Sequence, residues 1–220
     1  MAVASPVSAT ALFSDARIAA TSHEPDAASL TTVYGALGKQ WTHPVREVWL
    51  EIGFGGGEHL VWQAQHNPDV GFIGSEPFEE GVVKVLIAID DKSLRNILVH
   101  PDDVRPLLRW LPEASLSRVF MLFPDPWPKK RHQKRRLFSP ELLRLLARAM
   151  RPQSELRLGT DIGDYARTAL AAVAQSADFR WTAEGPQDWR VRPDDWPPTR
   201  YEAKAGREGR RCYFFRFTRN

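Results

Sequence analysis

The sequence predicts an α/β fold built on a mostly parallel, doubly wound sheet. Short β-rich runs alternate with helical stretches from Val45 onward, which is the pattern of βαβ units. A glycine-rich turn, GFGGG, joins the first of these runs to a helical stretch, where a Rossmann-like sheet binds its cofactor. The 220 residues, 43% of them hydrophobic, are enough to bury one sizeable core.

Strands are expected where apolar and β-branched residues gather between turn residues. Such runs cover residues 45–53, 70–77, 96–103, 117–127 and 154–161, and later ones cover 179–184 and 211–217. The run at 117–127 is apolar enough for burial on both faces of the sheet. Together these runs predict a sheet of seven strands.

Helices are expected between the strands, at about 58–66, 79–90, 141–150 and 163–175. Ser139 and Pro140 precede the third of them as an N-cap and a first-turn proline. The remaining long segment, 185–210, is rich in proline and charge. An irregular connection of that length in a compact domain is usually functional.

Composition and charge exclude several classes of protein. The net charge is only +3, but basic residues gather at 129–136 and again from Arg200 to Arg219. A single cysteine, Cys212, excludes an intramolecular disulfide framework and fits a reducing, cytoplasmic compartment. Its place in the apolar run CYFFRF favours a buried strand residue over a reactive thiol. No apolar stretch reaches the roughly 18 residues of a membrane helix, and the histidines lack metal-ligand spacing.

Residues 1–44 are predicted to form a mobile or weakly structured N-terminal extension. They are rich in alanine, serine and threonine, and they lack both a basic n-region and a continuous apolar block. Residues 45–220 are predicted to form the folded domain.

The glycine turn LEIGFGGGEHL does not fit a dinucleotide. The dinucleotide pattern needs a third glycine at position 58, which is Glu58, although Gly53 and Gly55 fit. Glu51, two residues before the turn, would repel a pyrophosphate. A carboxylate there suits a cationic ligand such as the sulfonium compound S-adenosylmethionine, which the glycine backbone can approach closely. The alternative is a tight β–α turn with an incidental glutamate.

Acidic residues end the next strands as well. Glu76 closes the second strand, where Rossmann-like proteins place an acid that accepts hydrogen bonds from ribose hydroxyls. Asp102 or Asp103 closes the third strand, from which a carboxylate can accept a hydrogen bond from an adenine amino group. One such acid is a common surface residue, but three at the carboxyl edge of one sheet outline a pocket.

A second site is predicted at FPDPWPKKRHQKRR, which follows the fourth strand. Two prolines restrict the backbone around Asp125, and Trp127 offers a flat apolar face. A carboxylate beside an aromatic ring can hold a flipped guanine through its Watson–Crick N–H groups. The adjacent lysines and arginines would bind phosphates, so the cations position a polyanion and Asp125 selects the base. A rigid turn beside a solvated basic segment is the structural alternative.

These motifs resemble those of the bacterial tRNA (guanine-N7)-methyltransferases. The matching stretches are LEIGFGGGEHL, GFIGSEPF, FPDPWPKKRHQKRR, GTDIGDYA and TRYEAKAGREGRR, in the order of that family and over roughly four-fifths of the chain. The acidic corner with its basic continuation is the most specific of them. The resemblance implies a Rossmann-like methyltransferase sheet with an antiparallel last strand.

The resemblance also implies an activity and its residues. The reaction would transfer a methyl group from S-adenosylmethionine to N7 of a guanine in the variable loop of tRNA, forming 7-methylguanosine. Asp125 would be the catalytic residue. The cofactor side would be lined by Glu51, Gly53, Gly55, Glu76, Asp102 or Asp103, and Asp125. The substrate would contact Lys129, Asp161, Thr199, Arg200, Tyr201 and Glu202, and the RNA would contact Arg131, Lys134, Arg135 and Arg136. The enzyme would be a cytoplasmic monomer or homodimer.

Three other functions stay open at this point. A methyltransferase acting on an exocyclic base amine also uses an Asp-Pro corner followed by an aromatic residue, and the methylated atom would distinguish it. A non-catalytic RNA-binding relative would bind RNA in a salt-dependent way without binding the cofactor. An NAD-linked dehydrogenase fits least, because of Glu58 and the charge of Glu51.

Overall fold

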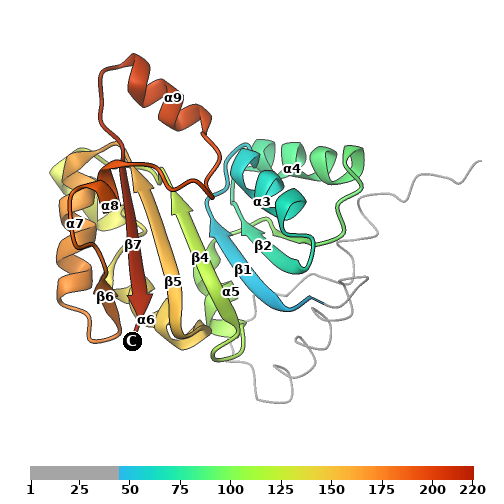
Figure 1. The fold of residues 1–220 in the computed structure, drawn as a ribbon, viewed down its shortest axis with the longest axis horizontal. Helices are drawn as coiled ribbons and strands as arrows, with labels where there is room; N and C mark the ends of the chain where they lie inside the picture. Colours follow the sequence, from blue (N-terminus) through green and yellow to red (C-terminus); the bar gives the residue numbers. More distant parts are fainter. Residues whose placement is uncertain (1–44) are drawn as a thin grey trace, which may run out of the picture.

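The computed structural model describes residues 45–220, so the extension predicted at 1–44 lies outside the described residues. Its centre is a seven-stranded sheet in the order β3-β2-β1-β4-β5-β7-β6 (Figure 1). The strands are β1 (Glu47–Ile52), β2 (Val70–Ser75), β3 (Ile97–His100), β4 (Leu116–Leu122), β5 (Met150–Thr160), β6 (Phe179–Trp181) and β7 (Tyr213–Arg219). Strands β1 to β5 are parallel, whereas β7 is antiparallel to both of its neighbours. The predicted fold class is confirmed.

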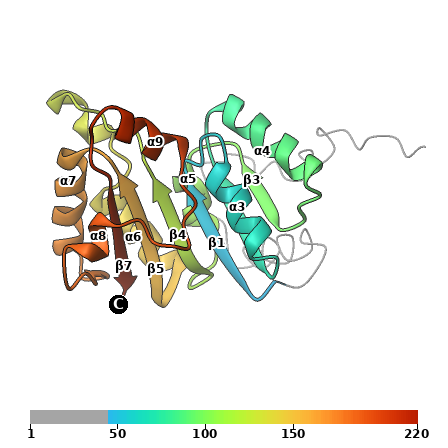
Figure 2. The same cartoon turned by 45° about the horizontal axis from the view of Figure 1, so that its top comes forward.

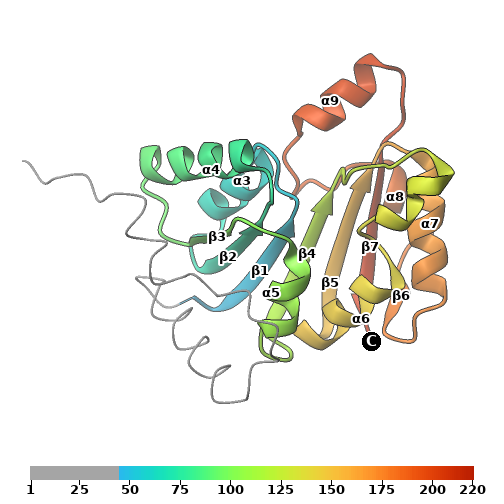
Figure 3. The ribbon, with the colours of Figure 1, turned by 180° about the vertical axis from the view of Figure 1, so that it is seen from behind.

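Helices cover both faces of the sheet. One face carries α3 (Glu58–His66) and α4 (Glu79–Asp91), and the other carries α5 (Val104–Trp110), α6 (Pro140–Ala149) and α7 (Gly163–Ala174) (Figures 1 and 3). Each face has its own core, with Leu108, Leu142 and Phe215 in one and Leu60, Phe72 and Val85 in the other. Among residues 45–220, no helix is long and apolar enough to span a membrane.

The segment 185–210 is less irregular than expected. It contains two short helices, α8 (Gln187–Arg190) and α9 (Arg200–Arg207). Figures 1 and 2 place α9 above the edge of the sheet at which the parallel strands β1, β4 and β5 end. The prediction of a functional connection therefore gains a structural basis, because the segment crosses the edge where α/β sheets bind ligands.

The predicted strand at 117–127 is wrong at its end. Strand β4 stops at Leu122, and the FPDPW corner is a loop, because its prolines have no N–H group for the sheet ladder. A short 3-10 helix, η1 (Lys130–Arg135), then carries the basic run.

The N-terminus of α6 forms as predicted. The Ser139 hydroxyl accepts a hydrogen bond from the Leu142 amide at 3.3 Å, and Pro140 occupies the first turn. The helix then buries Leu142, Leu143 and Leu146 against the sheet.

Loss of this cap should be measurable. Replacing Ser139 with alanine is expected to lower the free energy of unfolding by about 1 kcal/mol, since the amide it bonds loses its acceptor. The melting temperature should fall by about 2–4 °C for a chain of this size. Ser139→Asp keeps an acceptor and should melt close to the wild-type temperature. Equal melting of all three proteins would show that the cap contributes nothing.

Candidate active site and nucleic-acid interface

The predicted acids meet at one edge of the sheet. Glu51 is the penultimate residue of β1, Glu76 directly follows β2, and Asp161 directly follows β5. Asp102 and Asp125 follow β3 and β4 within three residues. Because these five strands are parallel, all of their carboxyl ends lie at the same edge. The structure thus brings the residues together as expected from the strand pattern.

Backbone hydrogen bonds continue beyond the strands and fix the start of each loop. The Gly53 amide donates to the Ser75 carbonyl at 2.8 Å, and the Glu76 amide donates to the His100 carbonyl at 3.1 Å. The Phe123 amide donates to the Gly159 carbonyl at 2.7 Å. The loops that carry the acids therefore leave the sheet from fixed positions.

Glu76 holds the glycine turn. Its carboxylate accepts hydrogen bonds from the Gly55 amide at 2.8 Å and from the Phe78 amide at 3.0 Å, and the residue is 5% exposed. The turn also lies against α4, where a Cβ at Gly81 would be 2.2 Å from the Gly55 carbonyl oxygen. Glycine is therefore required at Gly81 for this close approach. A carboxylate has about four acceptor positions, so two amides leave Glu76 able to accept hydrogen bonds from a ligand.

Glu51 is bound to a histidine that the sequence did not single out. Its Oε2 lies 2.7 Å from Nδ1 of His59, and both side chains are almost fully buried. The ring of His59 packs against Phe120 and Trp196. His59 lies in the first turn of α3, directly after the glycines, and its contact fixes the orientation of the Glu51 carboxylate at the end of β1.

Asp102 and Asp103 differ in their partners. Asp103 caps α5 by accepting from the Arg105 amide at 2.8 Å, and the Arg105 guanidinium pairs with it at 2.6 Å. The hydrogen bonds from Arg105 lower the pKa of the Asp103 carboxyl. Asp102 is exposed and accepts from the Asp103 amide at 2.6 Å. Both residues stand at the end of β3, and the choice between them stays open.

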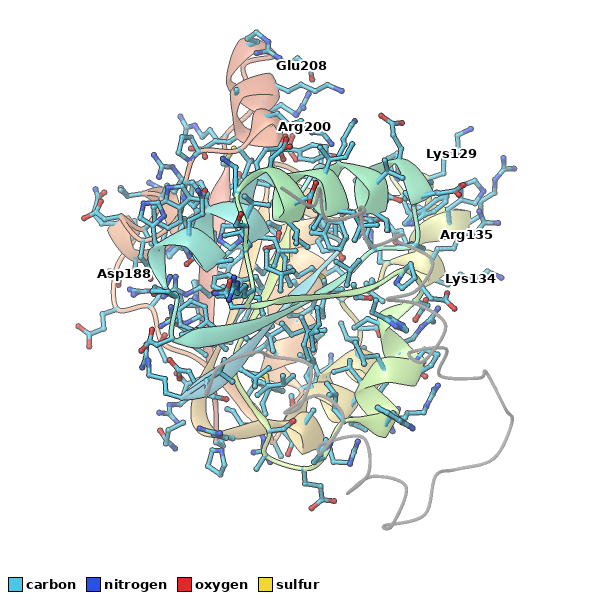
Figure 4. All side chains as sticks on the ribbon, turned by 90° about the vertical axis from the view of Figure 1, so that its right-hand side faces the viewer. Lys129, Lys134, Arg135, Asp188, Arg200 and Glu208 are labelled. Atoms are coloured by element: carbon cyan, nitrogen blue, oxygen red, sulfur yellow. The ribbon has the colours of Figure 1, made fainter. Side chains whose placement is uncertain are left out.

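The start of α9 packs onto the glycine turn. Thr199 caps the helix by accepting from the Glu202 amide at 3.2 Å, and Arg200 pairs with Glu58 at 3.5 Å. The Tyr201 ring stacks on Phe123, with centroids 6.2 Å apart and planes 16° apart. Figure 4 shows Arg200 at the base of α9, above α4. The late segment, which contains predicted substrate residues, therefore reaches both the glycine turn and the acidic corner.

Glu202 and Asp161 are paired with arginines. Glu202 Oε1 lies 3.2 Å from Nε of Arg192, whereas its Oε2 is buried without a hydrogen-bond partner among the described residues. Asp161 accepts from Nε of Arg210 at 2.7 Å. A buried carboxylate oxygen without a partner is uncommon in a folded protein and marks a position where a ligand can donate a hydrogen bond.

A cavity of about 810 Å³ lies between α9 and the start of β7. Glu202 and Arg210 line it, together with Cys212. Burial raises the pKa of the Cys212 thiol to about 11, with smaller contributions from Glu202 and Asp161. The sequence predicted a buried strand residue, but Cys212 is half-buried and lies one residue before β7. The raised pKa keeps the thiol mostly protonated at neutral pH.

The FPDPW corner is held in an unusual backbone conformation. Phe123 and Trp127 have positive φ angles of 52° and 40°, in the left-handed region that L-residues rarely adopt. Asp125 lies between them and is exposed to solvent. Such strained residues persist only where the surrounding structure holds them, and they concentrate at functional sites.

One face of the Trp127 ring, which the sequence suggested as a stacking surface, is covered by an arginine. The Arg135 guanidinium lies over its ring at 4.9 Å, and His132 meets it edge to face at 5.9 Å. The stacked pair Phe123–Tyr201 lies at the carboxyl edge instead. Aromatic packing at the corner thus includes a residue from α9, which local sequence patterns could not connect to it.

The basic run divides into exposed and buried cations. Lys129, Arg131, Lys134 and Arg135 are exposed, and Figure 4 shows Lys129, Lys134 and Arg135 projecting from one side of the molecule. The expectation that Arg136 meets RNA is wrong for this structure, because its side chain is only 2% exposed and is bonded internally. Lys130 is exposed too, so five neighbouring exposed cations remain as a phosphate-binding surface.

The carboxyl edge of the sheet combines an acidic region at the glycine turn with a basic region at η1. Carboxylates surround the glycine turn, which fits a cationic ligand with hydroxyl and amino donors, and the unpartnered Glu202 oxygen adds an acceptor. Exposed cations begin at Lys129, four residues after Asp125, and continue along η1. Among residues 45–220, no cluster of His, Cys, Asp and Glu could hold a metal ion. The arrangement therefore supports a cation-binding pocket beside a polyanion-binding surface.

Comparisons with known proteins agree with this arrangement. Residues 45–215 match a family model described as "Putative methyltransferase". A tRNA (guanine-N(7)-)-methyltransferase of a Ruegeria species is 53% identical over 174 residues, which cover 79% of this chain and 68% of the relative. The enzyme of the same name from Rhodospirillum rubrum is 52% identical over 176 residues, covering 80% of this chain and 69% of that relative.

Solved structures share the fold at low sequence identity. The aminoglycoside resistance methyltransferase NpmB1 aligns with a TM-score of 0.56 and 18% identity, covering 84% of this chain and 93% of that one. SMU.1697c from Streptococcus mutans, solved in complex with SAH, aligns with a TM-score of 0.53 and 8% identity, covering 87% and 98%. Because the chain is 53% and 52% identical to these two relatives over 79% and 80% of its length, it belongs to the tRNA (guanine-N7)-methyltransferase family.

Proposed function

We propose that this protein transfers a methyl group from S-adenosylmethionine to N7 of a guanine in the variable loop of tRNA. The observation that carries the proposal is the exposed Asp125 between a carboxylate-lined glycine turn and an exposed basic helix. The acids would hold the cationic methyl donor, and the cations would hold RNA phosphates. This arrangement lies within a chain whose relatives carry the name of that activity.

Cofactor binding is assigned to the glycine turn and its acids. Glu76 has acceptor capacity for the ribose hydroxyls, and the backbone of Gly53 and Gly55 allows a close approach. Glu51, held by His59, contributes negative charge beneath the turn. Asp102 or Asp103 would accept from the adenine amino group. S-adenosylmethionine, when bound, supplies the methyl group.

Asp125 orients the base and stabilises charge. Guanine N7 carries an in-plane lone pair in the neutral base, so no side chain has to remove a proton before transfer. The protein's task is then to align that lone pair with the methyl carbon. Asp125 accepts hydrogen bonds from the Watson–Crick edge, and its charge balances the positive charge that develops on the purine. Lys129, Asp161 and residues 199–202 would complete the substrate pocket.

We also propose a cellular compartment and an oligomeric state for the enzyme. The single cysteine fits the reducing cytoplasm, where residues 45–220 would act as the methyltransferase domain of a monomer or homodimer.

The reaction can be identified directly. The protein is incubated with methyl-labelled S-adenosylmethionine and unmodified tRNA, and the digested nucleosides are identified. Label should appear in 7-methylguanosine. A tRNA carrying 7-deazaguanine in the variable loop lacks the accepting nitrogen and should stay unlabelled. Label in an N-methylated exocyclic amine would overturn the assignment.

Asp125 should affect turnover far more than cofactor affinity. For Asp125→Ala we expect kcat to fall by about a hundredfold, because the base loses both its orienting acceptor and its compensating charge. The Kd for S-adenosylhomocysteine, measured by calorimetry, should change little. Asp125→Asn keeps the size and removes the charge, so it should also be slow. An unchanged kcat in both variants would contradict the role given to Asp125.

Gly81 should control cofactor affinity from a helix. A methyl group at position 81 would meet the Gly55 carbonyl and push the glycine turn away from Glu76. Such overpacking costs about 1–3 kcal/mol, so Gly81→Ala should raise the Kd for S-adenosylhomocysteine by roughly ten- to a hundredfold. Gly206→Ala is the matched helical control, since a Cβ there meets nothing within 4 Å. Equal affinities in the two variants would disprove the packing argument.

The exposed cations of η1 should govern RNA binding. Lys134→Gln and Arg135→Gln are each expected to weaken tRNA binding and to lower the slope of log K against log salt by about one. Arg180 provides a control, because it is exposed on β6 beside Asn220, away from η1. If Arg180→Gln changes the slope as much as Lys134→Gln does, the basic helix is not a specific RNA contact.

A further inference from the structure

Arg136 ends the basic run but does not share its environment. The five lysines and arginines before it in the run are exposed, whereas the Arg136 side chain is 2% exposed and its guanidinium lies 5.3 Å from the ring centre of Tyr165. Burial of an arginine without partners would be costly, so the surrounding acceptors must explain its position.

Three acceptors in different directions bind the Arg136 guanidinium. Its Nε donates to the Pro126 carbonyl at 3.0 Å, and its Nη1 donates to the Thr168 hydroxyl at 2.7 Å. Its Nη2 pairs with Asp164 at 2.5 Å. Thr168 and Asp164 belong to α7, whereas Pro126 directly follows Asp125 in the acidic corner. Arg136 therefore ties the corner to a helix packed on the sheet.

Asp164, on α7, binds η1 as well as Arg136. It also accepts from Nε2 of Gln133, in η1, at 3.0 Å. The hydrogen bond from Arg136 keeps the pKa of the Asp164 carboxyl below its usual range, so the ion pair persists at neutral pH. Both η1 and the residue that follows it are thus bound to one carboxylate on α7.

The FPDPW corner requires stabilising contacts from outside the loop, such as the hydrogen bond from Arg136. Pro124, Pro126 and Pro128 have no N–H group, so the corner has few amide donors with which to brace itself. The positive φ angles of Phe123 and Trp127 are unfavourable for residues with a side chain and must be sustained by neighbouring contacts. A hydrogen bond to the Pro126 carbonyl acts on the peptide unit next to Asp125.

We propose that Arg136 is a positioning residue that holds the FPDPW corner on α7 and thereby fixes the direction of the Asp125 carboxylate. This inference rests on the proposed function of Asp125. It separates Arg136 from the cations before it, which contact RNA. Misplacement of a reacting group by about 1 Å can cost a hundredfold in rate, so loss of the hold should appear mainly in kcat.

The test compares Arg136→Lys with Arg136→Gln, using Lys134→Gln as the RNA-contact control. Lysine keeps the charge but is a compact donor that cannot match the spread of the guanidinium fork. We therefore expect both Arg136 variants to lose about ten- to a hundredfold in single-turnover methylation of tRNA. Their tRNA affinity, salt slope and Kd for S-adenosylhomocysteine should stay at the wild-type values. Lys134→Gln should show the reverse pattern.

A second measurement reports on the mobility of the FPDPW corner and does not depend on methyl transfer. Trypsin cleavage after Lys129 and Lys130, with the products identified by mass, should be faster in Arg136→Lys than in the wild-type protein, because the loop is released from α7. Asp164→Asn should show the same changes to a smaller degree, and it serves if the Arg136 variants melt below the assay temperature. In the double variant Arg136→Lys/Asp164→Asn, the losses in methylation rate should not add, since the two side chains share one contact.

Two outcomes would overturn the inference. One is a wild-type methylation rate in both Arg136→Lys and Asp164→Asn. The other is a salt slope in Arg136→Gln lowered as much as in Lys134→Gln while Arg136→Lys stays at the wild-type slope, which would make Arg136 an ordinary phosphate contact. The wild-type protein is assayed in parallel, so absence of 7-methylguanosine there would count against the proposed function and not against the contact of Arg136.

Discussion

Pairing of β1 with β2 on one side and β4 on the other is the constraint from which the site follows. The chain moves outward from β1 to β3 under one set of helices and then returns to β4 on the other side. At this reversal the loops after β1 and β4 diverge to opposite faces and leave a crevice. The glycine turn and the Asp125 corner are those two loops. These two loops are therefore adjacent because of the strand order.

The late segment then joins the two loops. Tyr201 stacks on Phe123 of the corner, and its neighbour Arg200 pairs with Glu58 at the glycine turn. Farther back, Gln63 on α3 donates to the Asp195 carbonyl at 2.7 Å, and Trp196 is buried beside His59. Residues more than 130 positions apart thus share one packed surface that joins α3, after the glycine turn, to the segment 185–210.

The sequence predicted those features that depend on local chemistry. Apolar runs located all seven strands, and Ser139-Pro140 located the start of α6, because these signals lie within a few residues of the structure they form. Helix α5 was missed, although Asp103 caps it and the proline in its first turn, Pro106, is compatible with a helix. The burial of Arg136 could not be predicted, because its ionic partner lies 28 positions later on another helix. The histidine that binds Glu51 has no local signature either.

The place of β7 in the sheet has a consequence for biosynthesis. This strand follows β6 in the chain but lies between β5 and β6, so β6 cannot join the sheet until β7 has been made. The segment that carries α8 and α9 connects these two strands and takes its final position only with them. During translation the parallel strands could assemble while the segment 185–210 was not yet in place. The carboxyl edge of a nascent chain would therefore stay uncovered until β7 had been made.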